Sequence, residues 1–199
     1  LPQRDAGGRR RGSGPRITGR SFAGARFASD ERREQTADHR GESQGHRLDD
    51  GGARVDPTRQ QRTGVPEVVF GEAKSDDALL SICGDLLARL PRVIVSRTPR
   101  ERVTRVAEAL GDAVVEQPFP GNTTVLCRPG SLPPPPCGRI AIFTAGTSDL
   151  PAAGEAATLA REMGCAVEVV ADVGVAGLHR LVAPLRRVVR DGVDVIVVA

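Results

Sequence analysis

The chain is poor in aromatic residues, with five Phe and neither Trp nor Tyr among its 199 residues. Proteins that stack single-stranded bases on aromatic side chains carry more rings than this, so we expect no nucleic-acid partner. Residues 1–50 contain no apolar run of signal-peptide or membrane length. We therefore expect a cytoplasmic protein without a membrane partner.

Cysteine is also scarce, and its spacing matches no C-x-x-C metal-binding or redox motif. The four cysteines are Cys83, Cys127, Cys137 and Cys165. We expect free thiols in a reducing compartment, and we expect Cys83, on the apolar stripe of a predicted helix, to pack in the core. The chain lacks a G-x-G-x-x-G motif and a Walker A lysine, which disfavours dinucleotide dehydrogenases and P-loop enzymes.

The basic excess of the chain belongs to its N-terminal part. Residues 1–62 hold 14 Arg against 9 Asp and Glu, whereas residues 63–199 hold 14 Lys and Arg against 16 Asp and Glu. The acidic residues mixed among the arginines cancel most of the local field that a nucleic-acid-binding or membrane-binding arm needs. We predict that residues 1–53 form a disordered, Arg-rich tail.

A small α/β domain is predicted over residues 54–128, because hydrophobic periodicity there alternates between helical and strand patterns. The expected elements are a strand at 68–70, a helix capped by Ser75, a strand at 93–95, a helix opened by a capping box from Thr98 to Glu101, and strands at 113–115 and 123–127. The Pro-rich residues 129–138 are predicted to form a stiff linker to a second domain.

Residues 139–199 have a strand, helix, strand, helix, strand pattern. We expect strands at 139–143, 166–171 and 193–199, a helix from Pro151 to Gly164 that buries Ala152, Ala153, Ala156, Leu159, Ala160 and Met163, and a helix from Leu178 that Pro184 interrupts. This order predicts a doubly wound parallel sheet in a flavodoxin-like, three-layer α/β/α fold. The chain stops inside the third strand, so we expect this domain to be incomplete.

Ligands of such sheets bind at the carboxyl ends of the strands, where the loop after the first strand is rich in small and polar residues. Gly146 permits close approach of the backbone, Thr147 and Ser148 offer hydroxyls, and the start of the next helix favours an anion such as phosphate. Asp149 either caps that helix or acts on a ligand, by binding a ribose hydroxyl or by transferring a proton as a catalytic group.

The loop after the second strand carries Asp172, His179 and Arg180 within nine positions. A lone His is more often a structural group, but a His–Arg pair at this place is as compatible with a catalytic His179 and with ligand binding by Asp172 and Arg180. We expect this loop to converge with the loop at 144–149.

Three cations, Arg59, Arg62 and Lys74, flank the first predicted strand. They form either a solvated charged face or an edge that binds a phosphate or carboxylate.

The motifs together resemble the LarB family of nickel-pincer nucleotide cofactor biosynthesis, which is related to PurE, the aminoimidazole ribonucleotide carboxylase. The first motif, which ordinary PurE enzymes lack, is Arg59-x-x-Arg62-x-Gly64-x-Pro66-Glu67-Val-Val-Phe-Gly71-x-x-Lys74. The others are Ala145-Gly-Thr-Ser-Asp149 before an alanine-rich helix, and Asp172-Val-Gly-Val-Ala-Gly-Leu-His179-Arg180 before Asp194-Val-Ile-Val-Val-Ala199. The resemblance covers residues 54–199.

The resemblance implies a synthase of pyridinium-3,5-biscarboxylic acid mononucleotide. Such enzymes carboxylate nicotinic acid adenine dinucleotide at C5 of its pyridinium ring, with CO₂ or bicarbonate as co-substrate, and hydrolyse its phosphoanhydride with release of AMP. In the family a cysteine thiolate adds to the ring to make it electron-rich, as nucleophilic catalysis requires. Mg²⁺ is the expected cofactor of the anhydride step, and PurE-like folds associate into octamers, which implies a homo-oligomer.

Members of the family continue into a Gly-Met-Glu-Gly loop and then to that cysteine, both of which are expected beyond Ala199. None of the four cysteines occupies the family position, and the chain starts at Leu1 instead of Met. We therefore expect an inactive fragment of an active parent.

Two alternatives remain. One is a PurE-type mutase or carboxylase of purine biosynthesis, disfavoured by the first motif and by Gly177-Leu178 where PurE enzymes have Ser-Ala. The other is a non-catalytic nucleotide-binding module.

Overall fold

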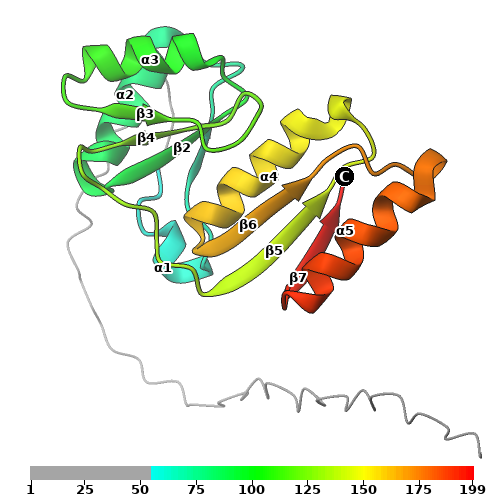
Figure 1. Cartoon of the computed structure of the whole chain (residues 1–199). Helices are drawn as coiled ribbons and strands as arrows, with labels where there is room; N and C mark the ends of the chain where they lie inside the picture. The colour runs from blue at the N-terminus through cyan, green and yellow to red at the C-terminus, as the bar shows by residue number, and fades with distance from the viewer. Residues whose placement is uncertain (1–54) are drawn as a thin grey trace, which may run out of the picture. The chain divides into compact units, whose positions relative to one another are not determined.

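Two separate β-sheets organise the computed structural model, which describes residues 55–199 (Figure 1). The predicted Arg-rich tail at 1–53 lies outside the described residues. Among residues 55–199, no helix combines the length and the apolarity that crossing a bilayer requires. The α/β fold class predicted from the sequence is confirmed.

The first sheet has four strands in the order β1-β2-β4-β3. Its strands are β1 (Val68–Phe70), β2 (Arg92–Ser96), β3 (Val114–Glu116) and β4 (Thr124–Cys127). The pair β1–β2 is parallel, whereas β2–β4 and β3–β4 are antiparallel. All four strands were expected from the sequence, and each lies within two residues of its predicted position.

Helices α2 (Asp76–Arg89) and α3 (Arg100–Ala109) supply the apolar core of this sheet. Ser75 caps α2 by accepting a hydrogen bond from the amide of Ala78 at 3.2 Å, as predicted. Cys83 is fully buried in this core, and burial raises the pKa of its thiol to about 12. The predicted packing role of Cys83 is confirmed. A short helix, α1 (Arg59–Thr63), was not expected.

The capping box predicted at the start of α3 is wrong. The N-cap of α3 is Pro99, and no side chain caps it. The hydroxyl of Thr98 donates instead to the carbonyl of Ser96 at 3.0 Å, and the amide of Thr98 donates to the carbonyl of Asn122. Thr98 is fully buried, so its hydroxyl bonds the nearest buried acceptor and does not reach the helix amides.

The second sheet has three parallel strands in the order β6-β5-β7 (Figure 1). Its elements in chain order are β5 (Gly138–Phe143), the 3₁₀ turn η1 (Thr147–Asp149), α4 (Leu150–Glu162), β6 (Cys165–Val170), η2 (Val175–Gly177), α5 (Leu178–Arg190) and β7 (Val195–Val198). Phe143 packs in one cluster with residues of α5, and Ile142 packs in another with Ala153 of α4. The two helices therefore cover opposite faces, and the predicted doubly wound arrangement is confirmed.

Pro184 does not interrupt α5, contrary to the prediction. Proline removes one backbone hydrogen bond from a helix interior, which disfavours the helix. Here three apolar side chains, Leu181, Leu185 and Val188, pack against the sheet from both sides of Pro184. Their burial holds the helix together across it.

The buried face of α4 also differs from the prediction. Ala153 is buried as expected, but Ala152, Ala156 and Met163 are exposed. The buried residues are Ala153, Gly154, Ala157, Thr158 and Glu162. This face is wider and more polar than one sheet requires, because α4 packs on β5 and also contacts the first sheet and the loop at 117–122.

Gly154 lies at the closest contact between α4 and that loop. A Cβ built on Gly154 would stand 1.7 Å from the carbonyl oxygen of Pro120. No side chain fits at this distance, so the backbone of the loop would have to move.

We predict that Gly154→Ala destabilises the protein by about 2 kcal/mol, since overpacking a closed contact costs about 1–3 kcal/mol. An exposed Gly→Ala change in a helix has the opposite sign and stabilises by about 1 kcal/mol. Urea unfolding of both proteins measures the difference. A variant more stable than the parent would show that the contact is absent. Ala152→Gly, at an exposed site of α4, is the control for helix propensity.

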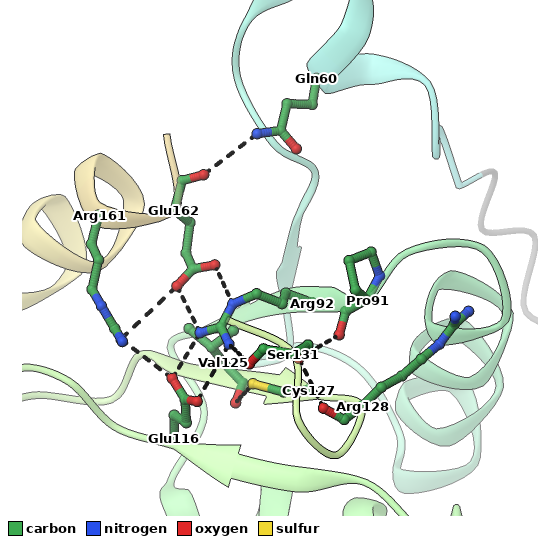
Figure 2. A network of polar contacts seen from close by, with 10 residues as sticks. All are labelled: Gln60, Pro91, Arg92, Glu116, Val125, Cys127, Arg128, Ser131, Arg161 and Glu162. Atoms are coloured by element: carbon green, nitrogen blue, oxygen red, sulfur yellow. Dashed lines mark hydrogen bonds and ion pairs between the residues drawn. The ribbon is translucent and has the colours of Figure 1, made fainter. Parts of the chain in front are cut away.

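A buried ionic network joins α4 to the first sheet (Figure 2). The guanidinium of Arg92 on β2 donates to Glu162 at 2.8 and 3.0 Å and to Glu116 on β3 at 2.7 Å. The side chains of Arg92 and Glu162 are only 6% and 4% exposed. Arg161 also donates to Glu116, at 3.3 Å. The network therefore connects residues that lie 70 positions apart in the sequence.

Glu116 makes the stability of this network depend on pH. Hydrogen bonding from Arg92, with the charges of Arg92 and Arg161, lowers the pKa of Glu116 below its ordinary value of 4.5 despite partial burial. A carboxyl whose pKa is lowered by folding stabilises the protein above its unfolded pKa, and this stability is lost as pH falls through the folded value.

We predict that Glu116→Gln lowers the free energy of unfolding at pH 7 by about 1 kcal/mol, because the lost charge-assisted hydrogen bonds are partly open to water. The difference from the parent should shrink as pH falls below about 4.5. Denaturant unfolding at several pH values measures this. Glu108→Gln, an exposed carboxylate on α3, is the control, and an equal response of both variants would contradict the prediction.

Candidate functional site

Two loops meet at the carboxyl edge of the second sheet, as the sequence predicted. The strand order reverses at β5, which places the loop at 144–149 next to the loop that follows β6. Three backbone hydrogen bonds join them, from Thr144 to Val170 at 3.0 Å, from Val173 to Thr144 at 3.1 Å and from Gly174 to Ala145 at 3.0 Å. Reversal of strand order at a carboxyl edge is the usual place for a ligand in an open α/β sheet.

The first loop is held in shape by the carboxylate of Asp149. One carboxylate oxygen accepts a hydrogen bond from the amide of Gly146 at 2.9 Å, and the other accepts one from the hydroxyl of Ser148 at 3.2 Å. Asp149 makes no side-chain cap on α4. Asp149 stands at the N-cap position of α4, but its carboxylate accepts from the amide of Gly146 at the start of η1 and not from an amide of α4. Thr147 and Ser148 are exposed.

Gly174 permits the close packing of the second loop on the first. A Cβ on Gly146 would have its nearest neighbour at 3.6 Å, an ordinary contact, whereas a Cβ on Gly174 would lie 2.9 Å from the carbonyl oxygen of Ala145. No sequence pattern predicts this contact, because it depends on how the second loop packs on the first.

The second loop presents an exposed ion pair. Asp172 has a φ of 59°, a left-handed conformation that is uncommon outside glycine, and its carboxylate accepts a hydrogen bond from Arg180 at 2.9 Å. His179 is exposed on the first turn of α5. Asp172 and Arg180 are therefore brought together, and both can exchange this contact for one with a ligand at little cost, since exposed pairs contribute little.

The three N-terminal cations lie on both sides of the short strand β1. Arg59 and Arg62 lie on α1, before β1, and pair with Glu67 and Asp56. Lys74 follows β1 at the opposite end of that strand. Whether the three cations bind one anion therefore stays a prediction, and Arg59 and Arg62 already pair with carboxylates of their own segment.

The cysteines lie away from the two loops. Cys83 and Cys127 are buried in the first sheet, where burial raises the pKa of Cys127 to about 11. Cys137 precedes β5 and Cys165 starts β6, so both stand at the amino ends of the parallel strands. The site is at the carboxyl ends, so none of the four thiols can attack a ligand bound there.

No preformed metal site is evident in residues 55–199, where no group of three or more His, Cys, Asp or Glu side chains gathers. Asp149 and Asp172 offer two carboxylates at the loops, and each already accepts hydrogen bonds. Mg²⁺ is commonly bound by one or two carboxylates together with substrate phosphates. These residues therefore fit the ion only if a phosphate ligand completes its coordination.

A second group of side chains, Phe70, Arg97 and Glu155, was not predicted from the sequence. Arg97, at the end of β2, has its guanidinium carbon 5.4 Å from the ring centre of Phe70 and pairs with Glu155 of α4 at 3.8 Å. Arg97 has a φ of 54°. A left-handed arginine leaves no signature in the sequence, so no pattern could have indicated this group.

We predict that Asp149→Ala speeds hydrogen exchange at the amide of Gly146 by about tenfold, because that amide loses a charge-assisted hydrogen bond. Mass spectrometry of deuterium uptake over residues 144–149 measures this. Ser148→Ala, which removes only the weaker partner of the same carboxylate, should leave exchange at Gly146 nearly unchanged. Equal rates in the parent and Asp149→Ala would show that the carboxylate does not hold the loop.

Comparison with known proteins gives two findings. Residues 48–118 match the LarB/PurE-like N-terminal domain. An uncharacterized protein of Methanocaldococcus jannaschii is 31% identical over 152 residues, which are 73% of this chain and 57% of that protein. The chain thus spans little more than half the length of this relative.

Proposed function

We propose that this chain belongs to the LarB/PurE-related family, whose N-terminal domain residues 48–118 match, and that it binds nicotinic acid adenine dinucleotide for the synthesis of pyridinium-3,5-biscarboxylic acid mononucleotide. The reaction carboxylates C5 of the pyridinium ring, with CO₂ or bicarbonate, and hydrolyses the phosphoanhydride with release of AMP. The observation that carries the proposal is the meeting of the loops at 144–149 and 172–177 at the carboxyl edge of a parallel sheet.

The loops offer groups that suit a pyridinium nucleotide. The exposed hydroxyls of Thr147 and Ser148 can donate to a phosphate, and Arg180 can exchange Asp172 for a phosphate oxygen. The carboxylates of Asp149 and Asp172 add negative charge where a positively charged ring would bind. In this proposal His179, exposed on the next helix turn, is available to move a proton.

We propose that Mg²⁺ binds together with the substrate. When bound, it would polarise the phosphoanhydride. Asp149 and Asp172 would hold it together with the diphosphate, since the described residues alone do not supply a complete site.

Ring carboxylation in this scheme needs a nucleophile that makes the pyridinium electron-rich. The four cysteines of the chain lie elsewhere, so the chain alone is proposed to bind the dinucleotide without turning it over. The non-catalytic nucleotide-binding alternative is favoured by the same observation.

We predict that the 199-residue chain binds nicotinic acid adenine dinucleotide and that Arg180→Met weakens binding by about tenfold, the loss of one charge-assisted hydrogen bond. Isothermal titration calorimetry measures this. Arg186→Met is the matched control, since it removes the same charge from an exposed position farther along α5. If the unmodified 199-residue chain does not bind the dinucleotide, the proposed substrate is rejected.

Incubation with bicarbonate, Mg²⁺ and the dinucleotide should release no AMP, which chromatography of the products detects. AMP release would contradict the proposal of binding without turnover, and a ring-carboxylated product would contradict the proposal that none of the four cysteines acts as the nucleophile.

A further inference from the structure

The carboxyl end of the parallel pair β1–β2 carries an exposed aromatic ring. Phe70 ends β1, is 51% exposed, and lies opposite Ser96 in the strand register. Among the Phe side chains that the structure describes, Phe119 is half-buried and Phe143 is buried, so Phe70 alone presents its ring to solvent. An exposed Phe is costly to keep in water, and a ring at the carboxyl end of a parallel strand stands where ligands bind.

The ring of Phe70 lies on the face of the sheet that α4 covers. Its neighbour Val69 packs into the core with α2 and α3, and successive residues of a strand point to opposite faces. Arg92 shares the face of Phe70 and binds Glu162 of α4. Phe70 is thus directed toward the second sheet and away from the helices of its own domain.

Arg97 links this ring to α4. Its guanidinium stands over Phe70, its side chain is 60% exposed, and Glu155 pairs with it from α4. Glu155 is six residues after Asp149 on a helix that rises about 1.5 Å per residue, so Arg97 and the first loop are separated by about 9 Å along α4. The carboxyl end of the parallel pair β1–β2 and the carboxyl edge of the second sheet therefore lie near the same half of α4.

We propose that Phe70 and Arg97 form a stacking platform for the adenine of a dinucleotide whose pyridinium half lies in the loops at 144–149 and 172–177. This inference rests on the proposed function and adds the position of the second ring. A base and an arginine stack face to face, and Phe70 offers an apolar surface to the same base.

Charge selects the orientation of the dinucleotide. The pyridinium nitrogen is cationic, so Asp149 and Asp172 favour that ring in the loops, although its 3-carboxylate offsets part of the charge. Adenine is neutral, and its ring nitrogens can accept hydrogen bonds from Arg97 while Glu155 can accept from its amino group.

The test uses AMP and nicotinic acid mononucleotide as separate probes of the two halves, with the intact dinucleotide, and measures their binding to the 199-residue chain by calorimetry. Phe70→Ala and Arg97→Ala should each weaken binding of AMP and of the dinucleotide by about tenfold, the effect of losing one stacking partner. Binding of nicotinic acid mononucleotide should stay within twofold of the parent.

Two further variants separate stacking from folding. Phe70→Leu keeps an apolar side chain but loses the aromatic face, so it should weaken AMP binding as Phe70→Ala does, whereas Phe70→Tyr should bind like the parent. Thermal melts confirm that each variant is folded.

Suppose that the unmodified chain binds the dinucleotide and that Phe70→Ala and Arg97→Ala bind AMP as well as it does. The stacking platform is then overturned, whereas the proposed function still holds. If Phe70→Ala and Arg97→Ala weaken binding of nicotinic acid mononucleotide more than they weaken binding of AMP, the proposed orientation is overturned. A parent that binds no dinucleotide would overturn the proposed function, and this inference with it.

Discussion

The buried guanidinium of Arg92 is the constraint on which the arrangement of the described residues depends. A cation taken out of water is stable only when its charge and its donors are satisfied, and Arg92 finds both partners outside its own strand. One partner, Glu162, lies at the end of α4. The ion pair of Arg92 with Glu162 therefore holds α4 against one face of the first sheet (Figure 2).

Helix α4 carries this constraint to the proposed site. Its last turn bears Glu162, its middle bears the tight contact of Gly154 with Pro120, and its start follows the loop that Asp149 holds. A helix is stiff over this length, so the loop and Arg97 are held at defined positions along it. The binding groups thus depend on contacts far from any ligand, which is how rigid elements position functional loops.

The local elements could be predicted from the sequence, and the contacts between them could not. Apolar periodicity located all the strands and the helices α2 to α5, because burial against one sheet leaves a regular pattern. It failed for the face of α4, because this helix also contacts the first sheet, where Glu162 is buried against Arg92. It failed at Pro184, where packing on both sides outweighs one lost hydrogen bond.

The candidate site divides in the same way. The loops at 144–149 and 172–180 follow from strand order alone, and their convergence was predicted correctly. Arg97 was missed because its left-handed backbone and its contacts with Phe70 and Glu155 arise only in three dimensions.

The burial of Glu162 has a practical consequence for dissecting the protein. The Pro-rich residues 129–138 look like a convenient place to divide the chain, yet the cut would part Arg92 from Glu162 and uncover Gly154, Thr158 and the apolar residues around them. Each piece would then present to solvent a surface shaped for the other. Co-expression of the two pieces, as a split protein that reassembles, follows from this geometry more naturally than the purification of either piece alone.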